Sequence, residues 1–96
     1  MTINLDTRIS IPEVVYTQEV GEETILLDIE GGKYFGLDPV GTRMWQLLRQ
    51  HGALRPAYEI LLTEYDVTPE RLEADLLALT SKMIEKGLAN IRTAAE

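Results

Sequence analysis

The residue types that most often perform catalysis are scarce in this 96-residue sequence. His51 is the only histidine, and the only serines, Ser10 and Ser81, lie far from it along the chain. A serine nucleophile needs a neighbouring base to take its proton, and no cysteine is present to serve as a nucleophile or as a thiolate metal ligand. The sequence therefore predicts neither nucleophilic catalysis nor a metal site.

Paired carboxylates and glycine-rich loops are the remaining sources of chemistry. Glu22–Glu23 and the pair Glu70 and Glu73 are close enough in sequence to share a proton. We expect the first pair in a turn and the second in the first turn of a helix, where carboxylates are normally solvated. The glycines lack the spacing of a phosphate-binding loop and the Lys-Ser/Thr that closes one. We predict a protein that is not an enzyme and needs no cofactor.

The charge of the chain is strongly acidic, with a formal net charge of −7. Residues 1–38 carry eight acidic and two basic groups, whereas residues 39–65 carry two acidic and three basic groups. A surface built from the first segment repels phosphate, which argues against nucleic acid as a partner. No apolar run approaches the roughly 18 residues of a membrane span, and no signal-peptide pattern opens the chain, so we expect a cytoplasmic protein.

Strands are predicted in the first half of the chain. Three segments are rich in β-branched and aromatic residues: Val14–Val20, Thr24–Glu30 and Lys33–Leu37. Short turns join them, so they form an antiparallel meander with Lys33–Leu37 at one edge. Gly31–Gly32 favours a two-residue hairpin before that edge strand.

The middle strand has an ambiguous pattern. Ile25, Leu27 and Ile29 share one face, and Asp28 and Glu30 share the other. Leu26 interrupts this alternation because it falls on the polar side. We therefore expect the polar side to be the outer face, and expect it to be partly covered.

Helices are predicted from Pro39 onward. The expected ranges are Pro39–Gln50, Pro56–Glu64 and Pro69–Lys86. Asp38 and Thr68 can cap the first and third helices, and Gly52 and Gly87 can end them. The expected core includes Trp45, Leu47, Leu48, Ile60, Leu61, Leu76 and Met83. The fold class is therefore α+β, a three-stranded antiparallel meander followed by three helices, as in a winged helix-turn-helix. DNA reading by the third helix is disfavoured, because its first turns hold three acidic residues and one basic residue.

The order and spacing of six short motifs resemble the PqqD-like family over residues 14–91. These motifs are Leu26–Asp28, Lys33–Gly41, Met44–Trp45, Glu64–Val67, Ala74–Asp75 and Lys86–Leu88. The resemblance implies a RiPP recognition element, a non-catalytic module that binds the leader segment of a ribosomally made precursor peptide and presents it to maturation enzymes. A separate chain with an N-terminal arm is most similar to the lasso-peptide version, whose implied partners are a leader protease and a cyclase.

The resemblance also implies where the leader binds, as an added antiparallel strand between the third strand and the third helix. The implied contact residues are Lys33, Tyr34, Phe35, Gly36, Leu37, Leu72, Asp75, Leu76 and Leu79. Edge backbone groups are free to pair, and Gly36 permits close approach of another chain. Two alternatives stay open for Leu76 and Leu79, core residue or groove wall, and two for Asp75, leader hydrogen bond or solvated charge.

The chain is expected to divide into three segments, and three functions remain as alternatives to the leading one. We expect an extended arm or frayed end over residues 1–12, the recognition domain over residues 13–91, and a frayed end over residues 92–96. The alternatives to lasso-leader binding are a winged-helix DNA-binding regulator, a PqqD-type chaperone for a radical-enzyme or quinone-cofactor pathway, and a structural subunit of an enzyme complex.

Overall fold

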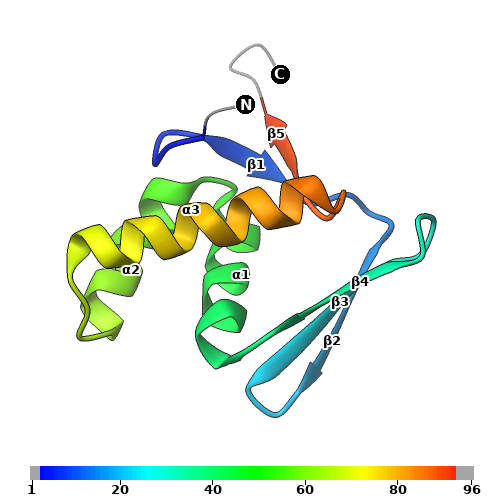
Figure 1. The fold of residues 1–96 in the computed structure, drawn as a ribbon, viewed down its shortest axis with the longest axis horizontal. Helices are drawn as coiled ribbons and strands as arrows, with labels where there is room; N and C mark the ends of the chain where they lie inside the picture. Colours follow the sequence, from blue (N-terminus) through cyan, green and yellow to red (C-terminus); the bar gives the residue numbers. More distant parts are fainter. Residues whose placement is uncertain (1–2, 93–96) are drawn as a thin grey trace.

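The computed structural model describes residues 3–92, which contain five strands and three helices (Figure 1). The elements in chain order are β1 (Arg8–Ser10), β2 (Val15–Val20), β3 (Glu23–Asp28), β4 (Lys33–Leu37), α1 (Pro39–His51), α2 (Leu54–Glu64), α3 (Pro69–Glu85) and β5 (Asn90–Arg92). The chain therefore has the predicted α+β organisation, a three-stranded antiparallel sheet followed by three helices, with one further strand at each end.

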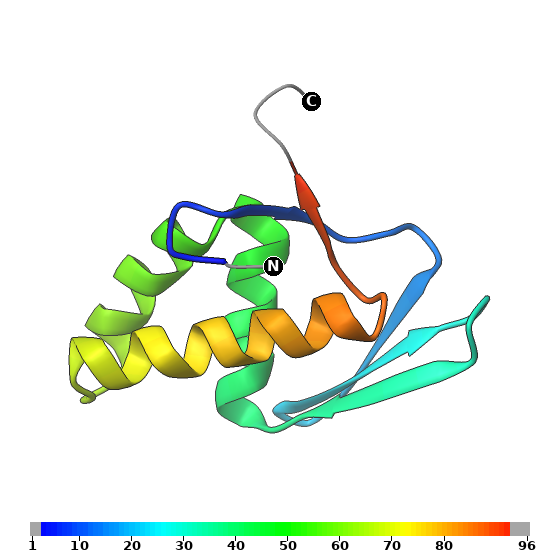
Figure 2. The same ribbon diagram turned by 45° about the horizontal axis from the view of Figure 1, so that its top comes forward.

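The sheet has the predicted meander topology, in the order β2-β3-β4 with both pairs antiparallel. β4 pairs only with β3 and so forms one edge of this sheet. The helices pack on one side: α1 contacts β3 and β4, and α2 lies between α1 and α3 in the contacts. The sheet extends away from the helices beyond the start of α1, and the C-terminal end of α3 points toward it (Figure 2).

β3 turns toward the helices the face that was expected to point outward. Leu26 is fully buried, whereas Ile25, Leu27 and Ile29 are 46%, 39% and 52% exposed. The register gives the reason: Leu26 lies opposite Phe35, which packs against the core. Both faces of β3 carry apolar residues, so alternation alone did not identify the inner one. The outer face is apolar and uncovered.

The loop between β3 and β4 is also longer than predicted. It contains four residues, Ile29 to Gly32, because β3 ends at Asp28 and pairs there with Lys33. The Asp28 carboxylate accepts a hydrogen bond from the Gly31 N–H at 3.1 Å, and the Asp28 carbonyl accepts one from the Gly32 N–H at 2.8 Å. Of the two glycines in this turn, only Gly32 adopts a positive φ, of 70°. Asp28 therefore closes a wider turn, which replaces the two-residue hairpin.

The helix boundaries confirm most of the predicted capping. The Asp38 carboxylate accepts a hydrogen bond from the Gly41 N–H at 2.7 Å, and the Thr68 hydroxyl accepts one from the Arg71 N–H at 3.2 Å. Gly52 ends α1 in the left-handed conformation, with φ of 66°. These local signals are short-range in sequence, which is why they could be recognised without a structure.

The start of α2 differs from the prediction by two residues. The helix begins at Leu54, and its N-terminal flank, Ala53, makes no side-chain cap. The Leu54 N–H instead donates to the Thr7 carbonyl at 3.3 Å, so a remote segment satisfies the helix end. Pro56 lies within the first turn, where the missing N–H removes no helical hydrogen bond.

The two ends of the described chain are paired with each other. β1 and β5 form an antiparallel pair centred on Ile9 and Ile91, and β1 also bridges to Ala53. Ile9 is 1% exposed, and Leu5 is also buried, so the described part of the predicted arm, a turn at residues 4–7 followed by β1, belongs to the core. The rest of the predicted frayed C-terminus, residues 93–96, lies outside the described residues.

The core contains nearly all of the predicted residues. Those predicted to be buried and found below 3% exposure are Trp45, Leu47, Leu48, Leu61, Leu76 and Met83. Ile60 is only half-buried. Val40 begins the apolar spacing of α1 but is 41% exposed, because it lies beside the capped end of the helix.

Candidate functional site

The free edge of β4 is the first component of the site. The Ile29 N–H, one residue beyond the end of β3, donates to the Val14 carbonyl at 3.3 Å. Hydrogen bonds alternate in direction along a strand, so Leu27 and Ile25 also bond toward β2. The intervening residues of β3 bond toward β4, to their register partners Lys33, Phe35 and Leu37. The N–H and C=O groups of Tyr34 and Gly36 consequently point away from the sheet and have no strand beside them.

The side chains of β4 divide between two faces of the sheet. Leu37 is 5% exposed and Phe35 is half-buried against the core, whereas the Tyr34 side chain is 72% exposed on the outer face. Gly36 lies opposite Ile25, and a β-carbon added there would meet no atom within 4 Å. The outer face of the sheet is therefore open at Gly36, in the middle of the edge strand.

Two open hollows meet at Gly36. One, of about 530 Å³, is lined by Gly32, Lys33, Tyr34, Phe35, Gly36 and Lys86. The other, of about 430 Å³, is lined by Val20, Glu23, Thr24, Ile25, Gly36, Leu37 and Asp38. The first hollow lies along the edge of β4, with lysines in its lining, and the second lies across the sheet near Leu37, with carboxylates in its lining.

Helix α3 contributes less open surface than the sequence predicted. Leu72 is 4% exposed and Leu76 is fully buried, so both are core residues, while Leu79 is half-buried and retains some surface. At the end of the helix, the Lys86 ammonium lies 5.8 Å from the centre of the Phe35 ring. This cation–π contact brings the C-terminal end of α3 to β4.

Asp75 is paired within its own helix. Its carboxylate lies 3.4 Å from the Arg71 guanidinium one turn earlier, and both side chains are more than half exposed. A pair of this kind is weak and easily rearranged. The carboxylate therefore remains accessible to a peptide donor.

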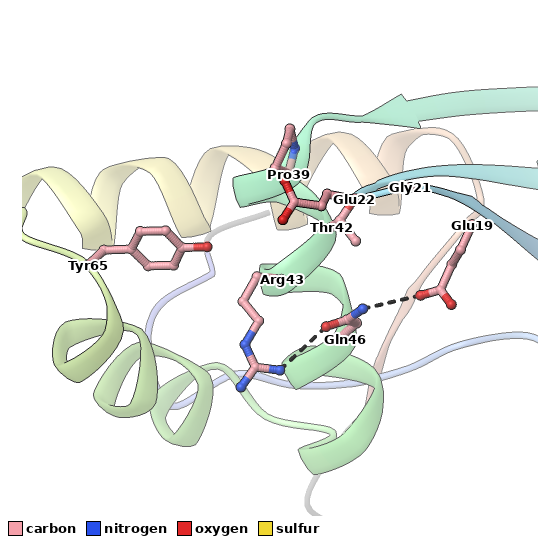
Figure 3. Close-up of a pocket in the computed structure, with 8 residues that line it drawn as sticks. All are labelled: Glu19, Gly21, Glu22, Pro39, Thr42, Arg43, Gln46 and Tyr65. Carbon is pink, nitrogen blue, oxygen red and sulfur yellow. Dashed lines mark hydrogen bonds between the residues drawn. The ribbon is translucent and has the colours of Figure 1, made fainter.

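A separate hollow beside α1 was not predicted. It has a volume of about 380 Å³ and is lined by Glu19, Gly21, Glu22, Pro39, Thr42, Arg43, Gln46 and Tyr65 (Figure 3). Its polar groups bond to one another: Gln46 accepts from Arg43 at 3.4 Å and donates to Glu19 at 3.2 Å. Arg43 also donates two hydrogen bonds to Glu64, at 2.8 and 2.6 Å. The network joins β2, α1 and α2.

This network shifts the protonation of its charged members. The hydrogen bonds from Arg43 lower the pKa of Glu64 below its ordinary value of 4.5, and the same bonds raise the pKa of Arg43. Both shifts favour the charged forms, which hold the ion pair. The polar residues of this hollow therefore hold β2, α1 and α2 together.

The residues considered for catalysis do not assemble. His51, Ser10 and Ser81 are all exposed, at the end of α1, on β1 and on α3 respectively. Among residues 3–92, no three His, Cys, Asp or Glu side chains approach closely enough to hold a metal ion. Within the same range, no helix is both long and apolar enough to cross a membrane.

Sequence reasoning missed Lys86 and the uncovered outer face. Lys86 could have been found, because it follows the apolar stripe of α3 at helical spacing, three residues after Met83. The outer face exposes Tyr16, Val20, Ile25, Leu27, Ile29 and Tyr34. A pattern that is apolar on both faces does not reveal which face the helices cover.

Comparison with known proteins gave one family and two similar structures. The family model described as "Coenzyme PQQ synthesis protein D (PqqD)" matches residues 23–89. A structure titled "TbiB1 in Complex with the TbiA(beta) Leader Peptide" is 31% identical, covers 84% of this chain and 94% of its own, and superposes with a TM-score of 0.79. A second, "Lasso peptide synthetase B1 complexed with the leader peptide", is 23% identical, covers 86% and 98%, and has a TM-score of 0.77, which supports the fold. No curated protein matched the chain.

Proposed function

The chain belongs to the PqqD family, and from this premise we propose that it is a non-catalytic module that binds the leader segment of a ribosomally made precursor peptide. The observation that carries the proposal is the free edge of β4, where the backbone groups of Tyr34 and Gly36 have no partner strand. A relative with 31% identity is titled as a complex with a leader peptide, which supports the same function. The encounter would take place in the cytoplasm, where precursors are synthesised.

The binding mode that we propose is strand addition. The leader lies antiparallel to β4, and its backbone pairs with the open N–H and C=O groups of the edge. Alternate leader side chains point inward, toward Phe35, Leu37 and the exposed part of Leu79. Asp75, at the outer side of α3, accepts a hydrogen bond from a leader donor. Leu72 and Leu76 support this wall from the core.

Magnitudes show which part of the contact provides affinity. Four backbone groups are open on Tyr34 and Gly36, and at about 0.5–1.5 kcal/mol each they contribute roughly 2–6 kcal/mol. Ordering a flexible peptide costs about 2–5 kcal/mol, which offsets this ladder. Net affinity must therefore come from apolar leader side chains, at about 25 cal/mol per Å² buried. The backbone hydrogen bonds therefore determine the register of the leader on β4, and the apolar side chains of the leader determine its affinity.

The direct test is calorimetric titration with the synthetic leader of the precursor encoded beside this gene. Gly36→Pro removes an N–H from the free edge of β4 and should weaken leader binding at least tenfold without unfolding the domain. Thr17→Pro is the matched control, because by the same register it removes an outward N–H from the opposite edge, β2. Binding that survives Gly36→Pro and fails with Thr17→Pro would place the leader on β2.

Salt dependence separates peptide capture from DNA binding. A leader held by backbone pairing and apolar anchors should lose less than tenfold in affinity between 50 and 200 mM salt, whereas a protein contacting 6–10 phosphates loses about 10³–10⁵. The same titration with a duplex DNA probe completes the comparison. No leader binding at either salt concentration would remove the proposal.

We further propose that the outer face of the sheet docks the leader protease, and a cyclase, of a lasso-peptide pathway. This face is apolar, and the charged residue that β3 adds to it is an acid, Glu23. Acidic neighbours, Glu22 and Glu30, lie in the adjoining turns. Two copies of a −7 chain would repel each other across this face, so the partner that fits it is an apolar surface with a basic rim.

This docking surface can be tested with the purified protease encoded beside the gene. Leu27→Lys should abolish protease binding and leave leader affinity unchanged, because Leu27 lies in the middle of the outer face. Gln50→Lys, at an exposed site on α1, adds the same charge elsewhere. A dimer in sedimentation experiments that Leu27→Lys dissociates would show that the face joins two copies of this chain.

A further inference from the structure

The lysines of this chain are gathered in one place. Lys33 is the first residue of β4, and Lys82 and Lys86 lie one turn apart at the C-terminal end of α3. These are all the lysines of the sequence, and they lie in a chain with a net charge of −7. The open hollow of about 530 Å³ has both Lys33 and Lys86 in its lining. The start of β4 is therefore a basic spot on an acidic protein.

The lysines are not used to hold the fold through ion pairs. The ion pairs among residues 3–92 are made by arginines, Arg43, Arg55 and Arg71. The register places Asp28 opposite Lys33, but the Asp28 carboxylate accepts from the Gly31 N–H in the turn. The other oxygen of this carboxylate lies close to Gly87, next to Lys86, but among residues 3–92 Asp28 forms no ion pair with either lysine, so these charges are not used to hold the fold.

Lys86 is held more firmly than an ordinary surface lysine. It is half-buried, and its ammonium lies 5.8 Å from the centre of the Phe35 ring. This contact holds the charge beside the edge strand, and Lys86 also lines the open hollow. Cation–π contacts of this kind lower the entropy that the side chain must lose on binding an anion.

We propose that Lys33 and Lys86, assisted by Lys82, form a carboxylate subsite that binds an Asp or Glu side chain of the leader. This inference rests on the proposed function and adds the chemistry of one leader position. In an antiparallel added strand, the leader residue opposite Lys33 lies three positions C-terminal to the one opposite Gly36. The leader should therefore carry its acidic residue at the C-terminal side of its apolar anchors. The rest of the acidic surface repels that carboxylate, so the subsite also sets direction.

The effect on affinity should be moderate. Ion pairs between exposed groups are weak, so each of the two lysines that share one carboxylate should change the dissociation constant by roughly two- to fivefold. The apolar anchors therefore remain the main source of affinity. The subsite adds register and a small salt dependence, well below that of a phosphate-binding surface.

The experiment is a double-mutant cycle by calorimetry. The synthetic leader of the neighbouring precursor is compared with peptides in which each Asp or Glu is replaced by Asn or Gln, against wild type and Lys86→Gln. Lys86→Gln should weaken binding of the wild-type leader roughly two- to fivefold, and it should not weaken further the binding of the peptide that lacks the critical carboxylate. Lys86→Arg should restore binding, and Lys33→Gln should behave like Lys86→Gln. Arg92→Gln, an equal charge change on β5, should have no effect.

The outcomes separate this inference from the proposed function. A leader that fails to bind wild type contradicts leader recognition itself. A leader that binds wild type with equal affinity to Lys86→Gln and Lys33→Gln overturns the carboxylate subsite alone. Coupling found only with an acidic residue N-terminal to the apolar anchors would overturn the proposed direction. A leader without an acidic residue beyond those anchors would also contradict the subsite.

Discussion

Arg43 is the residue through which three elements of the domain are joined. It binds Glu64 of α2 through two hydrogen bonds and reaches Glu19 of β2 through Gln46. Both charged side chains are about one-third exposed, so water screens their attraction. The contribution of this pair to stability is therefore modest, about 0.2–1 kcal/mol.

The pH dependence of this pair is a prediction at the residue scale. The pKa of Glu64 is lower in the folded protein than its ordinary value of 4.5. Its contribution is therefore complete above that value and is lost as the pH falls through the lower, folded-state pKa. Glu64→Gln should lower the free energy of unfolding by about 0.5 kcal/mol at pH 7, and the difference should be smaller at pH 3. Urea denaturation at both pH values measures it.

Glu59→Gln is the control for this prediction, since Glu59 is exposed on the same helix and makes no ion pair among the described residues. It should change the unfolding free energy little at either pH. A difference for Glu64→Gln that is the same at pH 3 and pH 7 would show that the side chain acts by hydrogen bonding or packing and not by charge.

At the scale of the element, β3 decides how the sheet faces the helices. Leu26 and Leu27 are adjacent and identical in type, yet one is fully buried and the other is 39% exposed. Hydrophobic alternation could not distinguish them, because Ile25, Leu27 and Ile29 make the outer face apolar as well. The corner between β4 and α1 could distinguish them. Asp38 caps α1 directly after Leu37, so Leu37 turns toward the core, and the register places Leu26 on the same face of the sheet as Leu37.

The matched pair Leu26→Ala and Leu27→Ala tests this facing. Leu26→Ala leaves a cavity under the helices and should lower the free energy of unfolding by about 2–5 kcal/mol. Leu27→Ala removes atoms that water already reaches and should cost less than about 1 kcal/mol. Chemical denaturation of both variants gives the comparison. Equal losses would mean that the outer face is covered in solution.

The sequence predicted elements better than it predicted contacts between distant elements. Capping residues such as Asp38, Thr68 and Gly52 act over a few positions, and they gave the helix ends closely. The pairing of β1 with β5 involves three residues at each end, which is too short a signal to recognise. For the site, the edge strand was predictable from local pattern. Leu76 was correctly predicted to be buried, whereas the burial of Leu72 depends on how α3 packs against its neighbours, which the spacing of residues in one helix does not determine.

At the scale of the whole molecule, the N-terminal arm is part of the core. Ile9 is 1% exposed, and its N–H donates to the Gly52 carbonyl at 2.9 Å. Ile9→Ala should therefore lower the free energy of unfolding by about 2–5 kcal/mol, a loss typical of a core residue. Thermal denaturation followed by circular dichroism measures it. Ile11→Ala, at a half-buried neighbouring site, should cost less. A wild-type melting temperature for Ile9→Ala would show that the arm is detached in solution.

The pairing of β1 with β5 also makes the chain nearly circular. These strands lie side by side although they come from opposite ends of the described chain (Figure 1). A linker from Arg92 back to Ile3 would close the ring and keep Leu5 and Thr7 in place, and new ends could then be opened at the exposed Gly21–Glu22 turn. A domain with this property can be spliced into a surface loop of another protein as a cassette, because its entry and exit points coincide.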